Sequence, residues 1–188
     1  MFKLHTLFSF VIFDTILRPI EMLCLSIIYY EMSIFIPVSI NISNRKILIV
    51  GGGNVALLKA SGLNRFTDAL TILAPQISHK LKQYPFSFIH KTYESSDIHG
   101  YFIVYACTDN RDLNKKIQED CNNAQILVAV CDNPSASDLV MPAVYTTQEI
   151  TIAVGTNGTS PKRGIAIRNQ IQRLIEERKI VTDQDISK

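Results

Sequence analysis

The sequence predicts an α/β fold: a doubly wound parallel sheet followed by a small C-terminal strand-and-helix appendage. Two observations carry this prediction. A short apolar run, Lys46–Val50, passes through three glycines into a helical pattern. Strand-like and helix-like segments then alternate with short loops as far as Cys131, which is typical of parallel sheets with helices on both faces.

The three glycines indicate a nucleotide-binding turn. Gly51, Gly53 and Ala56 match the G-x-G-x-x-G/A fingerprint. Its first glycine makes a tight turn, its second lets the backbone approach a pyrophosphate, and the helix N-terminus favours the anion. Because a strand precedes and a helix follows, we predict a Rossmann-like dinucleotide-binding domain. A purely structural glycine-rich turn is the alternative.

The composition indicates a globular protein with a small-molecule ligand. The chain has 188 residues, of which 47% are hydrophobic, enough for one full core and an appendage. Its net charge of +2 and lack of long like-charge runs give no support for a nucleic-acid partner. The four cysteines form no C-x-x-C pair, so we expect small buried groups in a reduced, cytoplasmic protein. The histidines show no metal-binding spacing, and no metal site is predicted.

Residues 1–31 differ from the rest and are interpreted as an apolar N-terminal extension. Their two apolar stretches, 7–13 and 22–30, are shorter than the ~18 residues needed to span a bilayer. No small-residue cleavage site follows the first stretch. We expect Met32, rather than Met1, to be the true start. A peripheral membrane contact through this extension is the less favoured alternative.

Residues 32–135 are predicted to form the dinucleotide-binding domain. Pro37 favours an extended lead-in over 34–40. In the first helix, Val55, Leu58 and Leu63 are expected to face the core. The patterns predict strands at 46–50, 69–73, 86–90, 101–107 and 126–131, and helices at 54–66, 76–83 and from a cap at Asp109 or Asn110 to about 122.

Residues 136–188 are predicted to form the appendage. Two extended segments, 140–145 and 149–154, precede a long amphipathic helix at 160–178 with Ser160 as its cap. Such a unit has too little core to fold alone. We therefore expect it to pack on the main domain or on a second copy, and a homodimer is the default expectation.

In open parallel sheets, ligands bind at the carboxyl ends of the strands. The residues leaving the strands are therefore the candidates for holding a cofactor: Gly51, Gly53, Asn54, Val55, Ala74, Pro75, Thr108 and Asp109. The acidic residue that usually binds the ribose is missing, because no carboxylate follows the second strand at 73–76. The sequence therefore lacks the residue that usually distinguishes NAD from NADP.

Asp132 is the carboxylate best placed for acid–base chemistry, since it follows the fifth strand. An Asp before Asn-Pro is also a common turn former, so both roles stay open at this point. Asp138 in the next loop is a second candidate for meeting a substrate. Thr156 and Asn157, just before the last helix, are available to bind an anionic ligand.

The motifs taken together resemble a known family. They are Gly51–Ala56 with Lys59-Ala60, Ala106–Asp109 with Leu113-Asn114, Cys131–Pro134, Met141–Ala143 and Ala153–Pro161. In this order they resemble the siroheme synthase amino-terminal module, the precorrin-2 dehydrogenase and sirohydrochlorin ferrochelatase family. The resemblance spans about residues 35–177.

The resemblance implies a Rossmann domain, a dimerisation region and NAD-dependent oxidation of precorrin-2 to sirohydrochlorin. Some members of the family also insert iron, and that second activity stays open here. By the resemblance, the glycine loop with Ala74, Pro75 and Thr108 would hold NAD, and Asp132 would be the general base. Thr156, Asn157 and the basic residues of the helix after them would contact the substrate, which carries many carboxylates. A non-catalytic dinucleotide-binding or tetrapyrrole-carrying module is the alternative.

Overall fold

The computed structural model describes residues 33–180. The predicted extension at 1–31, the choice between Met1 and Met32 as the start, and Cys24 all lie outside these residues. From Phe35 onward the chain forms one compact unit. Residues 33–40 contain no helix or strand, as expected for a lead-in around Pro37. Within the described range, no helix is long and apolar enough to cross a membrane.

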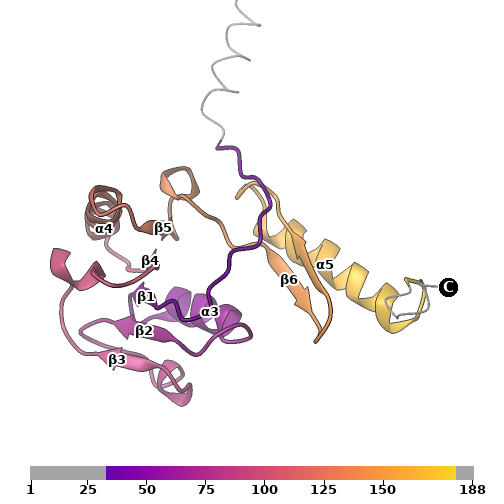
Figure 1. The fold of residues 1–188 in the computed structure, drawn as a ribbon, viewed down its shortest axis with the longest axis horizontal. Helices are drawn as coiled ribbons and strands as arrows, with labels where there is room; N and C mark the ends of the chain where they lie inside the picture. The colour runs from indigo at the N-terminus through magenta and orange to yellow at the C-terminus, as the bar shows by residue number, and fades with distance from the viewer. Residues whose placement is uncertain (1–32, 181–188) are drawn as a thin grey trace, which may run out of the picture. The chain divides into compact units, whose positions relative to one another are not determined.

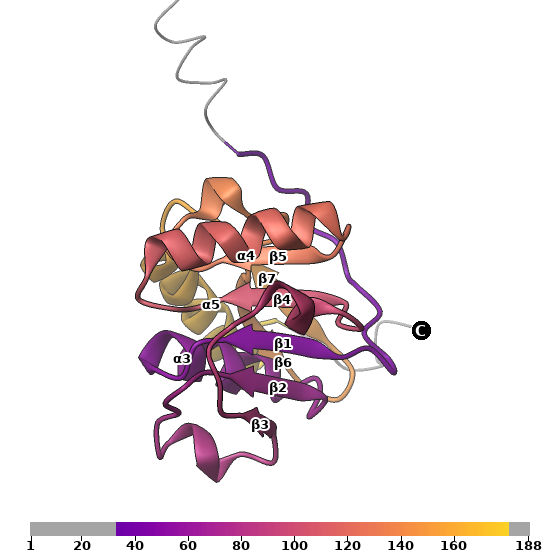
Figure 2. The same ribbon diagram turned by 90° about the vertical axis from the view of Figure 1, so that its left-hand side faces the viewer.

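A five-stranded parallel sheet forms the centre of this unit. Its order is β3-β2-β1-β4-β5, which Figure 2 shows from β5 at the top to β3 at the bottom. This is the doubly wound α/β fold that the alternating pattern predicted, with the order reversing beside β1. The strands are β1 (Ile47–Val50), β2 (Leu70–Leu73), β3 (Ser87–Ile89), β4 (Ile103–Ala106) and β5 (Leu127–Val130).

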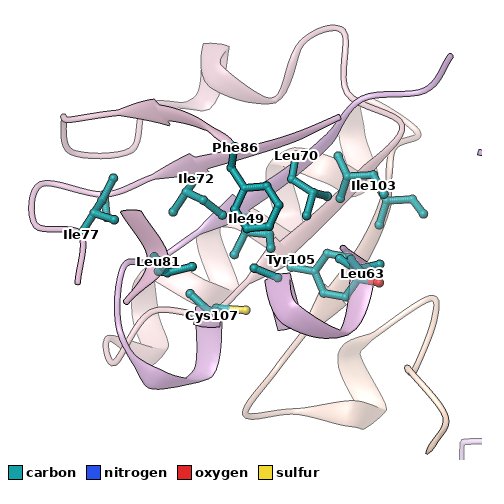
Figure 3. Close-up of a cluster of buried hydrophobic side chains, with 14 of the residues drawn as sticks. Ile49, Leu63, Leu70, Ile72, Ile77, Leu81, Phe86, Ile103, Tyr105 and Cys107 are labelled. Carbon is teal, nitrogen blue, oxygen red and sulfur yellow. The ribbon is translucent and has the colours of Figure 1, made fainter. Parts of the chain in front are cut away.

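Each face of the sheet has its own hydrophobic core, because alternate strand residues point to opposite faces. On one face, Ile49, Ile72 and Tyr105 pack with helix α3 (Asn54–Leu63), as Figure 3 shows. On the other face, Leu48, Val104 and Val128 pack with helix α4 (Arg111–Asn123). Four of the five strands are almost fully buried, which explains their continuous apolar sequences.

Two predictions about helices in this domain are wrong. In α3, Val55 and Leu58 are 47% and 70% exposed, whereas Ala56, Ala60 and Leu63 face the sheet. The small alanines allow the helix to lie close to the strands. This close packing, rather than the size of Val55 and Leu58, decides which face of the helix meets the sheet. The helix predicted at 76–83 is only a 3-10 turn at Leu81–Gln83. The residues before this turn follow the glycine loop, since the Ser78 amide donates to the Gly52 carbonyl at 2.9 Å.

The appendage has the predicted elements. Strands β6 (Ala143–Thr146) and β7 (Thr151–Val154) pair antiparallel, and helix α5 (Pro161–Glu176) packs on them (Figure 1). Two arginines donate to the Val144 carbonyl: Arg65, in the turn after α3, at 3.0 Å, and Arg168, on α5, at 3.2 Å. Ser160 precedes α5 as predicted, but its side chain makes no capping bond. Instead its amide donates to Thr156 Oγ1 at 3.3 Å.

Candidate nucleotide site and its acidic neighbour

The three glycines between β1 and α3 have different roles. Gly51 has φ +131°, and a Cβ there would overlap the Cys107 carbonyl at the end of β4. A Cβ on Gly52 would overlap the Gln76 carbonyl in the loop after β2. Gly53 is different, because a Cβ there would meet no atom within 4 Å. The first two glycines therefore bring three strand ends together, and the third presents bare backbone to open space.

The first turn of α3 is available for an anion. Its cap, Gly53, has no side chain to bond the first amides, and the turn contains no acidic residue. The amides of Asn54, Val55 and Ala56 have no acceptor within the helix because they begin it. Together with the helix dipole, they form the donor set that a pyrophosphate requires. The cradle therefore fits the phosphates of a dinucleotide.

The loop after β2 closes one side of this cradle. Ala74 is buried and Pro75 is exposed, as expected for residues leaving the strand. No carboxylate lies in the loop, in agreement with the sequence. The hydroxyl of Ser78 is buried and has no hydrogen-bond partner. A ribose hydroxyl is a suitable partner for such a group, since buried polar atoms are normally paired.

The loop after β4 lies at the point where the strand order reverses. Thr108 is half-buried and Asp109 is exposed. Of the two predicted caps for α4, Asn110 is the one used: its Oδ1 accepts from the amides of Asp112 and Leu113 at 3.0 and 3.1 Å. Asp109 is left free to face a ligand.

Asn114 connects this loop to the candidate acid–base residue. It is only 1% exposed, and its Oδ1 accepts from the Thr108 amide at 3.2 Å and from Thr108 Oγ1 at 2.7 Å. Its Nδ2 donates to the Thr108 carbonyl at 3.1 Å and to Asp132 Oδ1 at 3.0 Å. The side-chain amide thus bridges the ends of β4 and β5.

Sequence reasoning gave no role to Asn114, although a signal was present. The residue lies on the same face of α4 as Ile117 and Cys121, both buried. A polar side chain on the buried face of an amphipathic helix requires partners. Its position near the helix start, at the carboxyl ends of the strands, indicated where those partners would be.

Asp132 lies at the edge of a cavity of about 370 Å³ on the α4 side of the sheet. Its side chain is 33% exposed, and its Oδ2 lies 3.9 Å from Arg111 Nε. Asn114 holds Oδ1, so Oδ2 is the oxygen free to exchange a proton. The cavity is lined by two cationic side chains, Arg111 and Lys115, and by two carboxylates, Asp112 and Asp132.

The three residues predicted to meet the substrate, Asp138, Thr156 and Asn157, differ in exposure and in hydrogen bonding. The Asp138 carboxylate accepts from the Val128 amide at 2.9 Å, so it completes hydrogen bonding along the free edge of β5. Thr156 is half-buried and stabilises the start of α5 through Ser160. Asn157 is exposed with φ 49°, a left-handed conformation that asparagine tolerates.

Replacing Asn114 by leucine tests the bridge. Asn114→Leu keeps the branching and the number of side-chain heavy atoms but leaves the Thr108 amide without its acceptor, so we expect a loss of about 1–3 kcal/mol in the free energy of unfolding. Urea unfolding measures it. The control is Asn122→Leu, an exposed position on the same helix, where we expect a change within about 0.5 kcal/mol. Equal stability of the two variants would contradict a structural role for the bridge.

In the described part of the chain, no group of three or more His, Cys, Asp or Glu side chains could hold a metal ion. Three features make up the candidate site: the glycine cradle after β1, the loop after β2 that closes one side of it, and the Asn114 bridge between the ends of β4 and β5.

Comparison with known proteins agrees with this geometry. Residues 38–143 match the model of a family described as putative NAD(P)-binding. Siroheme synthase from Psychrobacter cryohalolentis is 34% identical over 145 residues, which are 75% of this chain and 28% of that protein. Siroheme synthase from Psychrobacter sp. strain PRwf-1 is 36% identical, covering 75% of this chain and 30% of the relative. The chain thus matches less than a third of these relatives' length.

A solved structure has the same fold. The precorrin-2 dehydrogenase SirC aligns with a TM-score of 0.65 and 22% identity, covering 74% of this chain and 70% of SirC. This similarity confirms the predicted Rossmann-like sheet. The chain therefore belongs to the putative NAD(P)-binding family.

Proposed function

We propose that this protein oxidises precorrin-2 to sirohydrochlorin with NAD+ as the oxidant. The observation that carries the proposal is the Asn114 bridge, because it links a carboxylate, Asp132, to the Thr108 loop beside the phosphate cradle. The siroheme synthase relatives support the choice of substrate. In the reaction, the substrate loses a hydride and a proton, and the products are sirohydrochlorin, NADH and a proton.

Bound NAD+ supplies the hydride acceptor. The chain's own groups orient the reactants and remove the proton. Asn114 Nδ2 fixes Oδ1 of Asp132, and Oδ2 takes the proton from the substrate. Arg111 Nε lies 3.9 Å from that oxygen, so the guanidinium and the carboxylate border the same cavity. Asp132 is thereby assigned as the catalytic residue.

The cofactor-binding residues are those of the cradle and its two flanking loops. Gly51, Gly53, Asn54 and Val55 would hold the pyrophosphate, Ala74 and Pro75 would border the adenosine, and Thr108 and Asp109 would border the nicotinamide half. We propose NAD as the cofactor because the resemblance to the siroheme synthase amino-terminal module implies it. The unpartnered Ser78 hydroxyl would bond a ribose hydroxyl.

The substrate's carboxylate arms would meet Thr156 and Asn157 and the basic residues of the cavity beside Asp132. Asp138 supports this region through β5, since its carboxylate is bonded to the Val128 amide. A polycarboxylate ligand suits such a surface because hydrogen bonds from cationic groups to carboxylates are the stronger kind.

An anaerobic assay of NADH formation tests the proposal. With precorrin-2 and NAD+, absorbance at the NADH band should rise together with sirohydrochlorin, and NADP+ should support a lower rate. A folded protein that binds NAD+ without turnover would instead be a non-catalytic dinucleotide-binding or tetrapyrrole-carrying module. Binding without any preference for NAD+ over NADP+ would contradict the cofactor assignment.

We further propose that the appendage dimerises in the cytoplasm. Ile165 and Ile167 on α5 are 46% and 38% exposed, and a two-stranded sheet with one helix leaves much of its apolar surface uncovered. A second copy would cover it. Light scattering should give twice the 21.2 kDa chain mass, and a monomer at micromolar concentration would contradict the proposal. The cytoplasmic location is proposed because the cysteines form no C-x-x-C pair in the sequence.

A further inference from the structure

Two cysteines lie side by side at the carboxyl ends of neighbouring strands. Cys107 follows β4 and Cys131 follows β5, and the preceding residues, Ala106 and Val130, are register partners. Their side chains therefore leave the same face of the sheet, and the Cys131 amide donates to the Ala106 carbonyl at 3.0 Å. The two Sγ atoms are 2.8 Å apart. The third described cysteine, Cys121, lies in the core on the opposite face.

We propose that Cys107 and Cys131 are a redox modification site, forming a reversible disulfide between β4 and β5 on reaction with a small disulfide such as oxidised glutathione. Neighbouring strands lie about 4.8 Å apart, which falls within the Cα separation that disulfides adopt. The two sulfur atoms already face each other. Neither thiol has a role in the proposed dehydrogenase chemistry, so the inference does not rest on it.

The two thiols differ in the way that this exchange requires. The Cys107 thiol, donating to Cys131, lowers the pKa of Cys131, and the Lys59 ammonium lowers it further. The same hydrogen bond, together with burial, raises the pKa of Cys107. Cys131 is also the more exposed of the two, since it is half-buried while Cys107 is 5% exposed. Cys131 is therefore the attacking thiolate.

The exchange proceeds in two balanced steps. Cys131 Sγ attacks one sulfur of oxidised glutathione, forming a mixed disulfide and releasing one glutathione thiolate. Cys107 Sγ then loses its proton and attacks Cys131 Sγ, which releases the second glutathione. Overall, the two cysteines lose two electrons and two protons, and the oxidant becomes two glutathione molecules.

The new bond would act on the nucleotide site. Thr108 and Asp132 directly follow the two cysteines, and the Cys107 carbonyl is the group against which Gly51 packs. Bringing the two Sγ atoms from 2.8 Å to bonding distance would shift these neighbours. We expect about a tenfold rise in the Kd for NAD+ on oxidation, measured by calorimetry before and after treatment with dithiothreitol.

Peptide mapping of the full chain tests the site itself. After incubation with oxidised glutathione, alkylation and proteolysis, tandem mass spectrometry should find Cys107 joined to Cys131, and dithiothreitol should reverse the link. In Cys107→Ala, a glutathione adduct should remain on Cys131. Cys121→Ala is the matched control and should behave as the unaltered protein.

Different outcomes would contradict the disulfide, its effect on NAD+ binding, or the proposed function. A persistent glutathione adduct on Cys131 in the unaltered protein, or a Cys107 that still alkylates on unfolding, would exclude the disulfide. If Cys107→Ala does not fold, Cys131→Ala replaces it, and its buried Cys107 should stay unmodified. An unchanged Kd would refute the coupling to the nucleotide. Failure of the reduced protein to bind NAD+ would instead count against the proposed function.

Discussion

Asp132→Asn is expected to lower kcat for precorrin-2 oxidation by about 10²–10⁴-fold, the range typical of general-base catalysis. The amide can still accept from Asn114 Nδ2, so the bridge to Thr108 and the affinity for NAD+ should remain close to those of the unaltered protein. Only the proton acceptor at Oδ2 is lost. Single-turnover NADH formation measures the step, and calorimetry measures the Kd for NAD+.

The matched control is Asp112→Asn. Asp112 borders the same cavity and is exposed, so this variant removes the same charge without touching the bridge. We expect its turnover to change much less. Equal losses in the two variants would indicate that cavity charge, rather than proton removal by Asp132, is responsible. Full activity of Asp132→Asn would reduce Asp132 to a turn former before Asn133-Pro134.

The sequence allowed the sheet to be predicted because its strands are buried on both faces. Such strands are continuous apolar runs, and their alternation with helices leaves few topologies. The exposed faces of helices were harder to predict. In α3 the alanines, not the larger Val55 and Leu58, face the sheet, since close packing there depends on small size.

The site was predictable only in part, for a related physical reason. A glycine fingerprint is local, and its three residues indicate the phosphate cradle directly. The Asn114 bridge and the cysteine pair are not local: they arise where β4 and β5 become neighbours, which depends on the register of the sheet. One sequence contains the residues but does not show which of them meet.

Gly53→Ala should raise the Kd for NAD+ at least tenfold, equivalent to about 1.4 kcal/mol, while barely changing stability. Gly53 has φ −94° and ψ −159°, an extended conformation open to alanine, and its Cβ would meet no protein atom within 4 Å. The added methyl group would instead occupy the space in which we propose that the pyrophosphate approaches the backbone. Calorimetry with NAD+ and urea unfolding measure the two quantities separately.

Gly51→Ala is the contrasting change, because it should lower stability, whereas Gly53→Ala should lower the affinity for NAD+. Its φ of +131° disfavours any residue with a Cβ, and the new atom would overlap the Cys107 carbonyl. The backbone conformation alone should lower the free energy of unfolding by about 1–3 kcal/mol, and the overlap adds to that loss. If Gly53→Ala loses stability but not affinity, the open space beside Gly53 does not receive the cofactor, and the proposed cradle is wrong.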